Sequence, residues 1–92
     1  MSVTLRLPTV LAKAAGGETV HQARGGTVGD VVTEVATRHP ELGPRLRDAN
    51  GQPYPYVIFY VDDEDIRFQQ GFSTPVADGA EILVVPAIAG GR

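Results

Sequence analysis

The segment TVGDVVTEVATRH, residues 27–39, is the one part of the chain with the period of an amphipathic helix. Its apolar positions recur three or four residues apart and form one stripe, made of Val28, Val31, Val32, Val35, Ala36 and His39. Thr27 is suited to cap the first turn, and Asp30 places a negative charge near the positive end of the helix dipole. Pro40 ends the helix, because the residue before a proline is pushed out of the α region. Since valine is a poor helix former, we expect this helix to pack on a sheet.

Two short strands are predicted before the helix. Residues 3–7 alternate between apolar and polar side chains, which is the period of a half-buried strand. Pro8 ends this strand, because proline cannot donate a hydrogen bond to the ladder. Gly16-Gly17 then breaks the chain, and residues 18–22 are predicted to form a second strand that pairs with the first as a hairpin.

The strongest strand signal follows the helix. Residues 56–61, YVIFYV, are β-branched or aromatic throughout. Both faces of this strand are apolar, so we expect it to be central or covered on each side. Weaker patterns predict a helical turn within 41–48, a turn at the acidic run 62–65, a short strand at 66–68 and a last strand at 80–85, closed by Pro86.

This order of elements predicts an α+β fold. One amphipathic helix laid across a mixed four- or five-stranded sheet hides the valine stripe most simply. With a right-handed crossover through the helix, the arrangement is a β-grasp, the ubiquitin-like architecture. A chain of 92 residues makes one domain, and we assign residues 1–86 to it and residues 87–92 to a flexible C-terminal tail.

Composition excludes several classes of function. The formal net charge of −3 argues against a nucleic-acid binder, which needs clustered positive charge. The absence of cysteine excludes disulfides, thiolate-held zinc, iron–sulfur clusters and a cysteine nucleophile. No apolar run approaches the roughly 20 residues of a membrane span, and the N-terminal residues do not resemble a signal peptide. We therefore expect a cytoplasmic protein that binds neither membrane nor nucleic acid.

The sequence holds no catalytic or metal-binding constellation, so no catalytic residue, metal ligand or cofactor is predicted. The two histidines are expected to be a solvated loop residue, His21, and a helix-end residue, His39. Ser2 and Ser73 lack the pattern of a nucleophile elbow. The acidic run 62–65 lacks the glycine and final glutamate of an EF-hand loop. It is either a solvated turn or a surface that steers the chain toward a basic partner.

The C-terminal residues AIAGGR are small and nearly uncharged. A frayed terminus is the simplest interpretation. However, the segment directly follows a predicted buried strand, and glycines can enter a channel too narrow for any other residue.

The strand order and this ending resemble the ThiS/MoaD sulfur carriers, relatives of ubiquitin, and within that family the CysO-type carriers of cysteine biosynthesis. The resemblance spans nearly the whole chain. It is carried by residues 3–11 with their Leu-Pro-Thr, Thr27-Val28-Gly29, YVDDEDIRF at 60–68, Ala77-Asp78-Gly79 and VPAIAGG at 85–91.

This resemblance implies a protein co-substrate rather than an enzyme. An adenylyltransferase related to ubiquitin-activating enzymes would join AMP to Gly91, and sulfur transfer would then give a thiocarboxylate. Ala87, Ile88, Ala89 and Gly90 would thread the tail into the partner. Arg92 departs from the family pattern. Either a JAMM-type metalloprotease removes it, or it is an appended residue, or it marks a carrier stored inactive.

The resemblance also suggests partners and alternatives. The sulfur acceptor would be a PLP-dependent cysteine synthase, or an enzyme making molybdopterin, thiamin or a secondary metabolite. Ubiquitin-like domains dock through the sheet face opposite the helix. Tyr56, Tyr60 and Phe68 are candidates for this face, beside the tail root at Ile88. The alternative for each of the three aromatic residues is a place in the core or in strand pairing. A modifier conjugated to lysines and an inert binding module are the competing interpretations.

Overall fold

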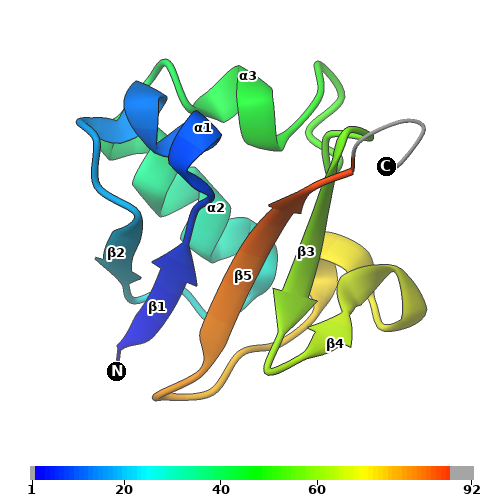
Figure 1. The fold of residues 1–92 in the computed structure, drawn as a ribbon. Helices are drawn as coiled ribbons and strands as arrows, with labels where there is room; N and C mark the ends of the chain where they lie inside the picture. Colours follow the sequence, from blue (N-terminus) through cyan, green and yellow to red (C-terminus); the bar gives the residue numbers. More distant parts are fainter. Residues whose placement is uncertain (1, 88–92) are drawn as a thin grey trace.

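The computed structural model describes residues 2–87 and shows a five-stranded mixed sheet crossed by one main helix (Figure 1). The strands run in the order β2-β1-β5-β3-β4. Their bounds are β1 Val3–Arg6, β2 Val20–Ala23, β3 Val57–Val61, β4 Glu64–Asp65 and β5 Glu81–Pro86. The predicted β-grasp fold is confirmed.

The first and last strands of the chain meet at the centre of the sheet. β1 pairs in parallel with β5, and β2 extends the sheet beyond β1 in an antiparallel hairpin. On its other side β5 is antiparallel to β3, which is antiparallel in turn to the short β4. Because β5 has a neighbour on both sides, the strand that leads to the C-terminus is held by hydrogen bonds along both edges.

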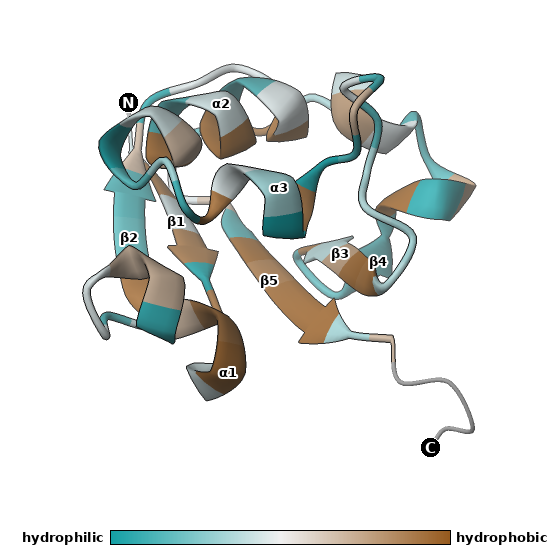
Figure 2. Ribbon diagram, turned by 90° about the horizontal axis from the view of Figure 1, so that it is seen from above, coloured by the Kyte–Doolittle hydropathy of each residue, from teal (hydrophilic) through white to brown (hydrophobic). Residues whose placement is uncertain are grey.

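The main helix, α2 (Val28–Arg38), forms as its sequence predicts. Thr27 is the N-cap, and its Oγ1 accepts a hydrogen bond from the Asp30 amide at 3.1 Å. Its valines are fully buried against the sheet, whose largest inward-facing side chains are Leu5, Phe59 and Ile82. Figure 2 shows the hydrophobic face of α2 turned toward β1 and β5. Each buried valine stabilises this packing by about 1.5–3 kcal/mol.

Two short helices complete one end of the molecule. α3 (Gly43–Leu46) lies inside the helical turn predicted for residues 41–48. α1 (Thr9–Ala12) and the 3₁₀ turn Lys13–Ala15 were not predicted from the sequence. Leu11, Ala12 and Ala15 are buried there and extend the hydrophobic core.

The prediction around the acidic run was wrong in detail. Residues 66–68 form a 3₁₀ helix, and the strand lies earlier, at Glu64–Asp65. The cause is a two-residue turn, because Asp62 and Asp63 both have positive φ, 47° and 76°, and return the chain at once against β3. The Asp65 carboxylate then accepts a hydrogen bond from the Arg67 amide at 2.8 Å, which starts the 3₁₀ helix.

The strand β3 is covered on one face only. Val57 and Phe59 are buried, whereas Ile58 and Tyr60 on the other face are half-buried. Although the residues on that second face are apolar or aromatic, no layer of residues 2–87 covers them.

Candidate functional site

The tail predicted to carry the chemistry begins at a well-anchored point. β5 ends at Pro86, which lies opposite Val57 of β3. The Ala87 amide donates a hydrogen bond to the Tyr56 carbonyl oxygen at 2.9 Å, so pairing with the β3 side continues one residue beyond the strand. The other predicted tail residues, Ile88, Ala89, Gly90, Gly91 and Arg92, lie outside the described residues.

A half-exposed row of side chains crosses the sheet on the face away from α2. Five residues stand in register along it, one on each strand: Val20, Arg6, Leu83, Tyr60 and Asp65. Val20 is 43% and Leu83 40% exposed, unusually high for large apolar residues in a sheet. A second pair in register on this face, Ile58 and Val85, is half-buried and lies closer to Pro86. We call these seven residues the sheet face.

The structure separates the three aromatic residues predicted to form a partner surface. Tyr60 belongs to the sheet face. Tyr56 precedes β3, is 61% exposed, and packs its ring edge-to-face on Tyr54 with centroids 5.3 Å apart. Phe68 is 82% exposed on the 3₁₀ helix, where the Arg67 guanidinium lies 5.9 Å from its ring centroid. Tyr56 and Phe68 are therefore surface residues rather than core aromatics.

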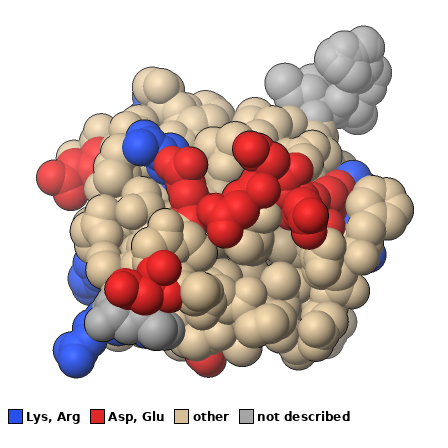
Figure 3. Space-filling model, turned by 90° about the horizontal axis from the view of Figure 1, so that it is seen from below, with Lys and Arg blue, Asp and Glu red and all other residues tan. Residues whose placement is uncertain are grey.

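Acidic side chains gather at the end of the molecule opposite the tail root. Asp62, Asp63 and Glu64 lie at the turn from β3 into β4, and Glu81 begins β5; we call these four residues the acidic band, and Figure 3 shows acidic side chains gathered on the face seen from below. Val61 pairs with Ile82 at this end of the sheet and Val57 with Pro86 at the other, so the β3–β5 ladder separates the band from the tail root. Arg6 forms an ion pair with Glu81 beside the sheet face.

Asp65 and Arg67 form a second ion pair next to the sheet face. The Arg67 Nη2 lies 2.6 Å from Asp65 Oδ2, and Arg67 Nε donates to the same carboxylate at 2.9 Å. These side-chain hydrogen bonds hold the pKa of Asp65 below its ordinary value, and they raise the pKa of Arg67. The pair fixes Asp65 in its charged form at the edge of the sheet.

One histidine expectation was wrong. His21 lies in β2, is only 4% exposed, and has its Nε2 2.7 Å from the Glu18 carbonyl oxygen. Its ring packs edge-to-face on His39, with centroids 5.1 Å apart. His39 stands at the C-terminal end of α2, as predicted. Within residues 2–87 no group of three or more histidine or acidic side chains is placed to hold a metal ion.

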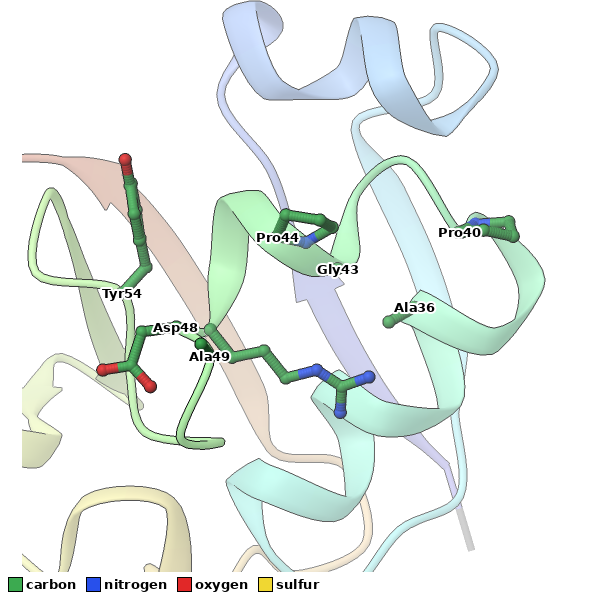
Figure 4. A pocket seen from close by; sticks show the side chains of 8 residues that line it. Ala36, Pro40, Gly43, Pro44, Asp48, Ala49 and Tyr54 are labelled. Atoms are coloured by element: carbon green, nitrogen blue, oxygen red, sulfur yellow. The ribbon is translucent and has the colours of Figure 1, made fainter.

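Sequence reasoning did not find a cavity of about 490 Å³ between the end of α2, α3 and the loop after α3. We call it the α3 pocket; Figure 4 shows its lining. The lining residues used below are Ala36, Pro40, Pro44, Arg47, Ala49 and Tyr54. They come from separate segments and share no sequence motif. None of the helices within residues 2–87 has the length and apolar character that crossing a membrane requires.

Comparisons with known proteins agree with the fold. The model of the ThiS family matches residues 5–91, and the chain therefore belongs to this family. The sulfur carrier protein CysO of Mycobacterium tuberculosis (strain H37Rv) is 38% identical over 93 residues, covering 99% of this chain and 100% of that protein. The chain is thus a homologue of a sulfur carrier.

Solved structures give the same result. CysO in the Amycolatopsis orientalis BexX/CysO complex matches with a TM-score of 0.89 at 37% identity, covering 97% of this chain and 99% of that one. SAMP1 from Haloferax volcanii shares the fold, with a TM-score of 0.82. The match is 24% identical and covers 99% of this chain and 100% of that one. CysO is described as a sulfur carrier protein and not as a catalyst, which supports the prediction of a protein partner rather than an enzyme.

Proposed function

We propose that this protein carries sulfur as a thiocarboxylate on Gly91, after removal of Arg92, for the synthesis of cysteine. The observation that carries the proposal is that β5, a central strand of the sheet, leads directly into the segment that holds Gly90-Gly91, in a chain 38% identical to CysO. Residues 1–86 then serve as the domain, and residues 87–92 as the arm that reaches into partner enzymes.

The proposed chemistry explains why the chain needs no catalytic group. A carboxylate is a poor acyl donor, because its charge is delocalised and its oxygen leaves badly. An adenylyltransferase transfers AMP from ATP to the Gly91 carboxylate and releases pyrophosphate. Sulfide attacks the acyl carbon and expels AMP, which leaves a C–S bond in place of the C–O bond. A persulfide donor expels AMP in the same way but gives an acyl disulfide, which a thiol then cleaves to the thiocarboxylate while a new disulfide forms on the donor. Because adenylation consumes ATP, we propose that the chain acts in the cytoplasm.

Removal of Arg92 must come before adenylation in this proposal. With Arg92 present, the terminal carboxylate belongs to Arg92, and the long, charged side chain of this residue does not fit a channel gated by glycine. A metalloprotease of the JAMM type would hydrolyse the Gly91–Arg92 bond and release free arginine. Ala87, Ile88, Ala89 and Gly90 are small or apolar, so they suit a narrow path to the partner's active site.

We assign docking to the sheet face together with Tyr56 and Phe68. An exposed apolar centre with charged neighbours is typical of protein interfaces, where aromatic residues are enriched. The same face would serve in turn the adenylyltransferase and the sulfur acceptor. For the acceptor we propose a PLP-dependent cysteine synthase that uses an activated serine.

Intact-mass spectrometry of the protein recovered from its native cell tests the proposal. We expect species that lack Arg92, and among them one in which sulfur replaces a terminal oxygen, a gain of about 16 Da. Arg92 retained in every species contradicts the processing step. A ladder of adducts joined through lysine would instead favour a ubiquitin-like modifier, and a cysteine-deficient strain rescued only by the chain ending in Gly91 would support cysteine as the product.

A further inference from the structure

The α3 pocket has the size and the walls of a binding site. Its volume of about 490 Å³ lies within the range of roughly 300–1,000 Å³ that small-ligand sites occupy. Ala36, Pro40, Pro44 and Ala49 line it with small or ring-shaped apolar groups. Tyr54 stands across the pocket from Ala36 and Pro40 in Figure 4. A flat apolar group, such as an aromatic ring, fits between such walls.

The pocket also offers one cation without a charged partner. Arg47 is half-buried, and its Nη1 donates a hydrogen bond to Thr33 Oγ1 at 3.0 Å. No carboxylate of residues 2–87 lies within 4.0 Å of its guanidinium. A guanidinium is suited to bind a carboxylate through two parallel hydrogen bonds. A ligand group that pairs with Arg47 in this pocket therefore carries a negative charge.

The acidic residue of the pocket is already used within its own loop. Asp48 Oδ1 accepts hydrogen bonds from the backbone amides of Asn50 and Gln52 at 2.9 and 3.0 Å. Figure 4 places Asp48 beside Tyr54, away from Ala36 and Pro40. Asp48 therefore shapes the loop and does not neutralise Arg47.

The pocket lies at the end of the molecule from which the tail leaves. Tyr54 lines it, packs on Tyr56, and Tyr56 in turn accepts the hydrogen bond from Ala87. Figure 1 shows α3, the loop after it and the end of β5 at this same end. β5 spans about 17 Å at roughly 3.3 Å per residue, which places the acidic band far from the pocket. The α3 pocket and the tail root therefore lie at one end of the domain, and the acidic band lies at the other.

We propose that the α3 pocket receives an aromatic side chain of the adenylating enzyme, with a carboxylate beside that ring paired to Arg47. This inference rests on the proposed function, because it requires an enzyme that takes up the tail. It adds a second contact, on the helical side of the domain, to the sheet face. The pocket and its charge then select an enzyme that presents a ring next to an acidic group.

Kinetics of ATP–pyrophosphate exchange test the role of the pocket, using the chain ending at Gly91 and the adenylyltransferase of the same cell. Arg47→Glu reverses the charge inside the pocket, and Ala49→Trp fills the pocket from an exposed position. We expect each to raise the KM for the carrier about tenfold or more while kcat is unchanged. Arg45→Glu is the matched control, since Arg45 is exposed, lies in α3 two residues before Arg47 and does not line the pocket.

A small probe tests the chemistry of the pocket separately. In NMR titrations of the ¹⁵N-labelled full chain, 3-phenylpropionate should shift the amides of residues 43–54 and bind more tightly than the neutral 3-phenylpropanamide. Arg47→Gln should remove the difference between the two probes. Equal shifts from both probes, or shifts elsewhere only, contradict the proposed ligand chemistry.

The outcomes separate this inference from the proposed function. If the unchanged carrier supports no exchange, the proposed function fails and this inference fails with it. If the carrier supports exchange but Arg47→Glu and Ala49→Trp match the Arg45→Glu control, the inference alone is overturned. Circular dichroism of each variant establishes that it is folded before its KM is interpreted.

Discussion

Asp62 and Glu81 are joined by a reciprocal pair of hydrogen bonds. The Asp62 amide donates to the Glu81 carbonyl oxygen at 3.0 Å, and the Glu81 amide donates to Asp62 Oδ1 at 3.0 Å. The first bond extends the β3–β5 ladder past Val61, and the second satisfies the first amide of β5 with a side chain. The acidic run is therefore part of the scaffold that holds the central strand, and not only a charged surface.

Replacing Asp62 by alanine should weaken the fold. The change removes the acceptor of the Glu81 amide and puts a residue with a poor left-handed preference at a φ of 47°. We expect a loss of about 1–2 kcal/mol in the free energy of unfolding, measured by urea titration. Asp62→Asn is the control, because asparagine keeps an oxygen acceptor and tolerates the left-handed region. If both variants lose the same free energy of unfolding, the lost hydrogen bond from the Glu81 amide is not the cause of the destabilisation.

Gly25 and Gly26 should differ sharply when replaced by alanine. A Cβ at Gly25 would lie 2.5 Å from the Asp30 Cβ and 2.9 Å from the Asp30 backbone carbon, close to the N-terminus of α2. At Gly26 the nearest atom is the end of the Asp30 side chain, 4.0 Å away. We expect Gly25→Ala to lower stability by about 1–3 kcal/mol, because the helix start must move.

Gly26→Ala serves as the matched control and should change stability by less than about 0.5 kcal/mol. For a domain of this size a loss of 1 kcal/mol lowers Tm by about 4–8 °C, so thermal unfolding resolves the two variants. Equal melting temperatures would show that the approach of Gly25 to α2 is not tight in solution.

The Asp65–Arg67 pair should make a pH-dependent contribution to stability. Because the folded-state pKa of Asp65 is lowered, its contribution is present above the unfolded pKa of about 4 and is lost as the pH falls through the folded pKa. Arg67→Gln removes the partner that lowers this pKa. We therefore expect the stability difference between the unchanged protein and this variant to be larger at pH 6 than at pH 3. A stability difference that grows as the pH falls contradicts a stabilising Asp65–Arg67 pair.

The overall fold was predictable because its signals are long and redundant. The valine stripe of α2 and the run 56–61 each identify an element by themselves. The order of these elements allows few ways to bury their apolar faces, and for this reason the β-grasp could be predicted. α1 could not be predicted in the same way, since four residues give no helical period and its position depends on Leu11 being buried in the core.

Parts of the candidate site could not be predicted, since they depend on tertiary geometry. The strand expected at residues 66–68 begins two residues earlier, as β4, because the turn at Asp62 and Asp63 returns the chain directly against β3. The burial of His21 follows from its pairing with Leu5, because it shares the inward face of the hairpin. The α3 pocket joins residues from α2, α3 and the following loop, which no pattern along the chain brings together.

Leu83 provides the most direct test of the sheet face. It lies at the centre of the row that includes Arg6 and Tyr60, and it is 40% exposed, so a polar substitute leaves the core intact. Leu83→Asp should raise the KM for the carrier in ATP–pyrophosphate exchange about tenfold, because a charge would be buried at the centre of the proposed interface. Val10→Asp is the control, since Val10 is 60% exposed on α1 and lies outside the sheet face. Equal KM values for these two variants would remove the sheet face from the docking surface, while the role of Gly91 would stand on the mass measurement alone.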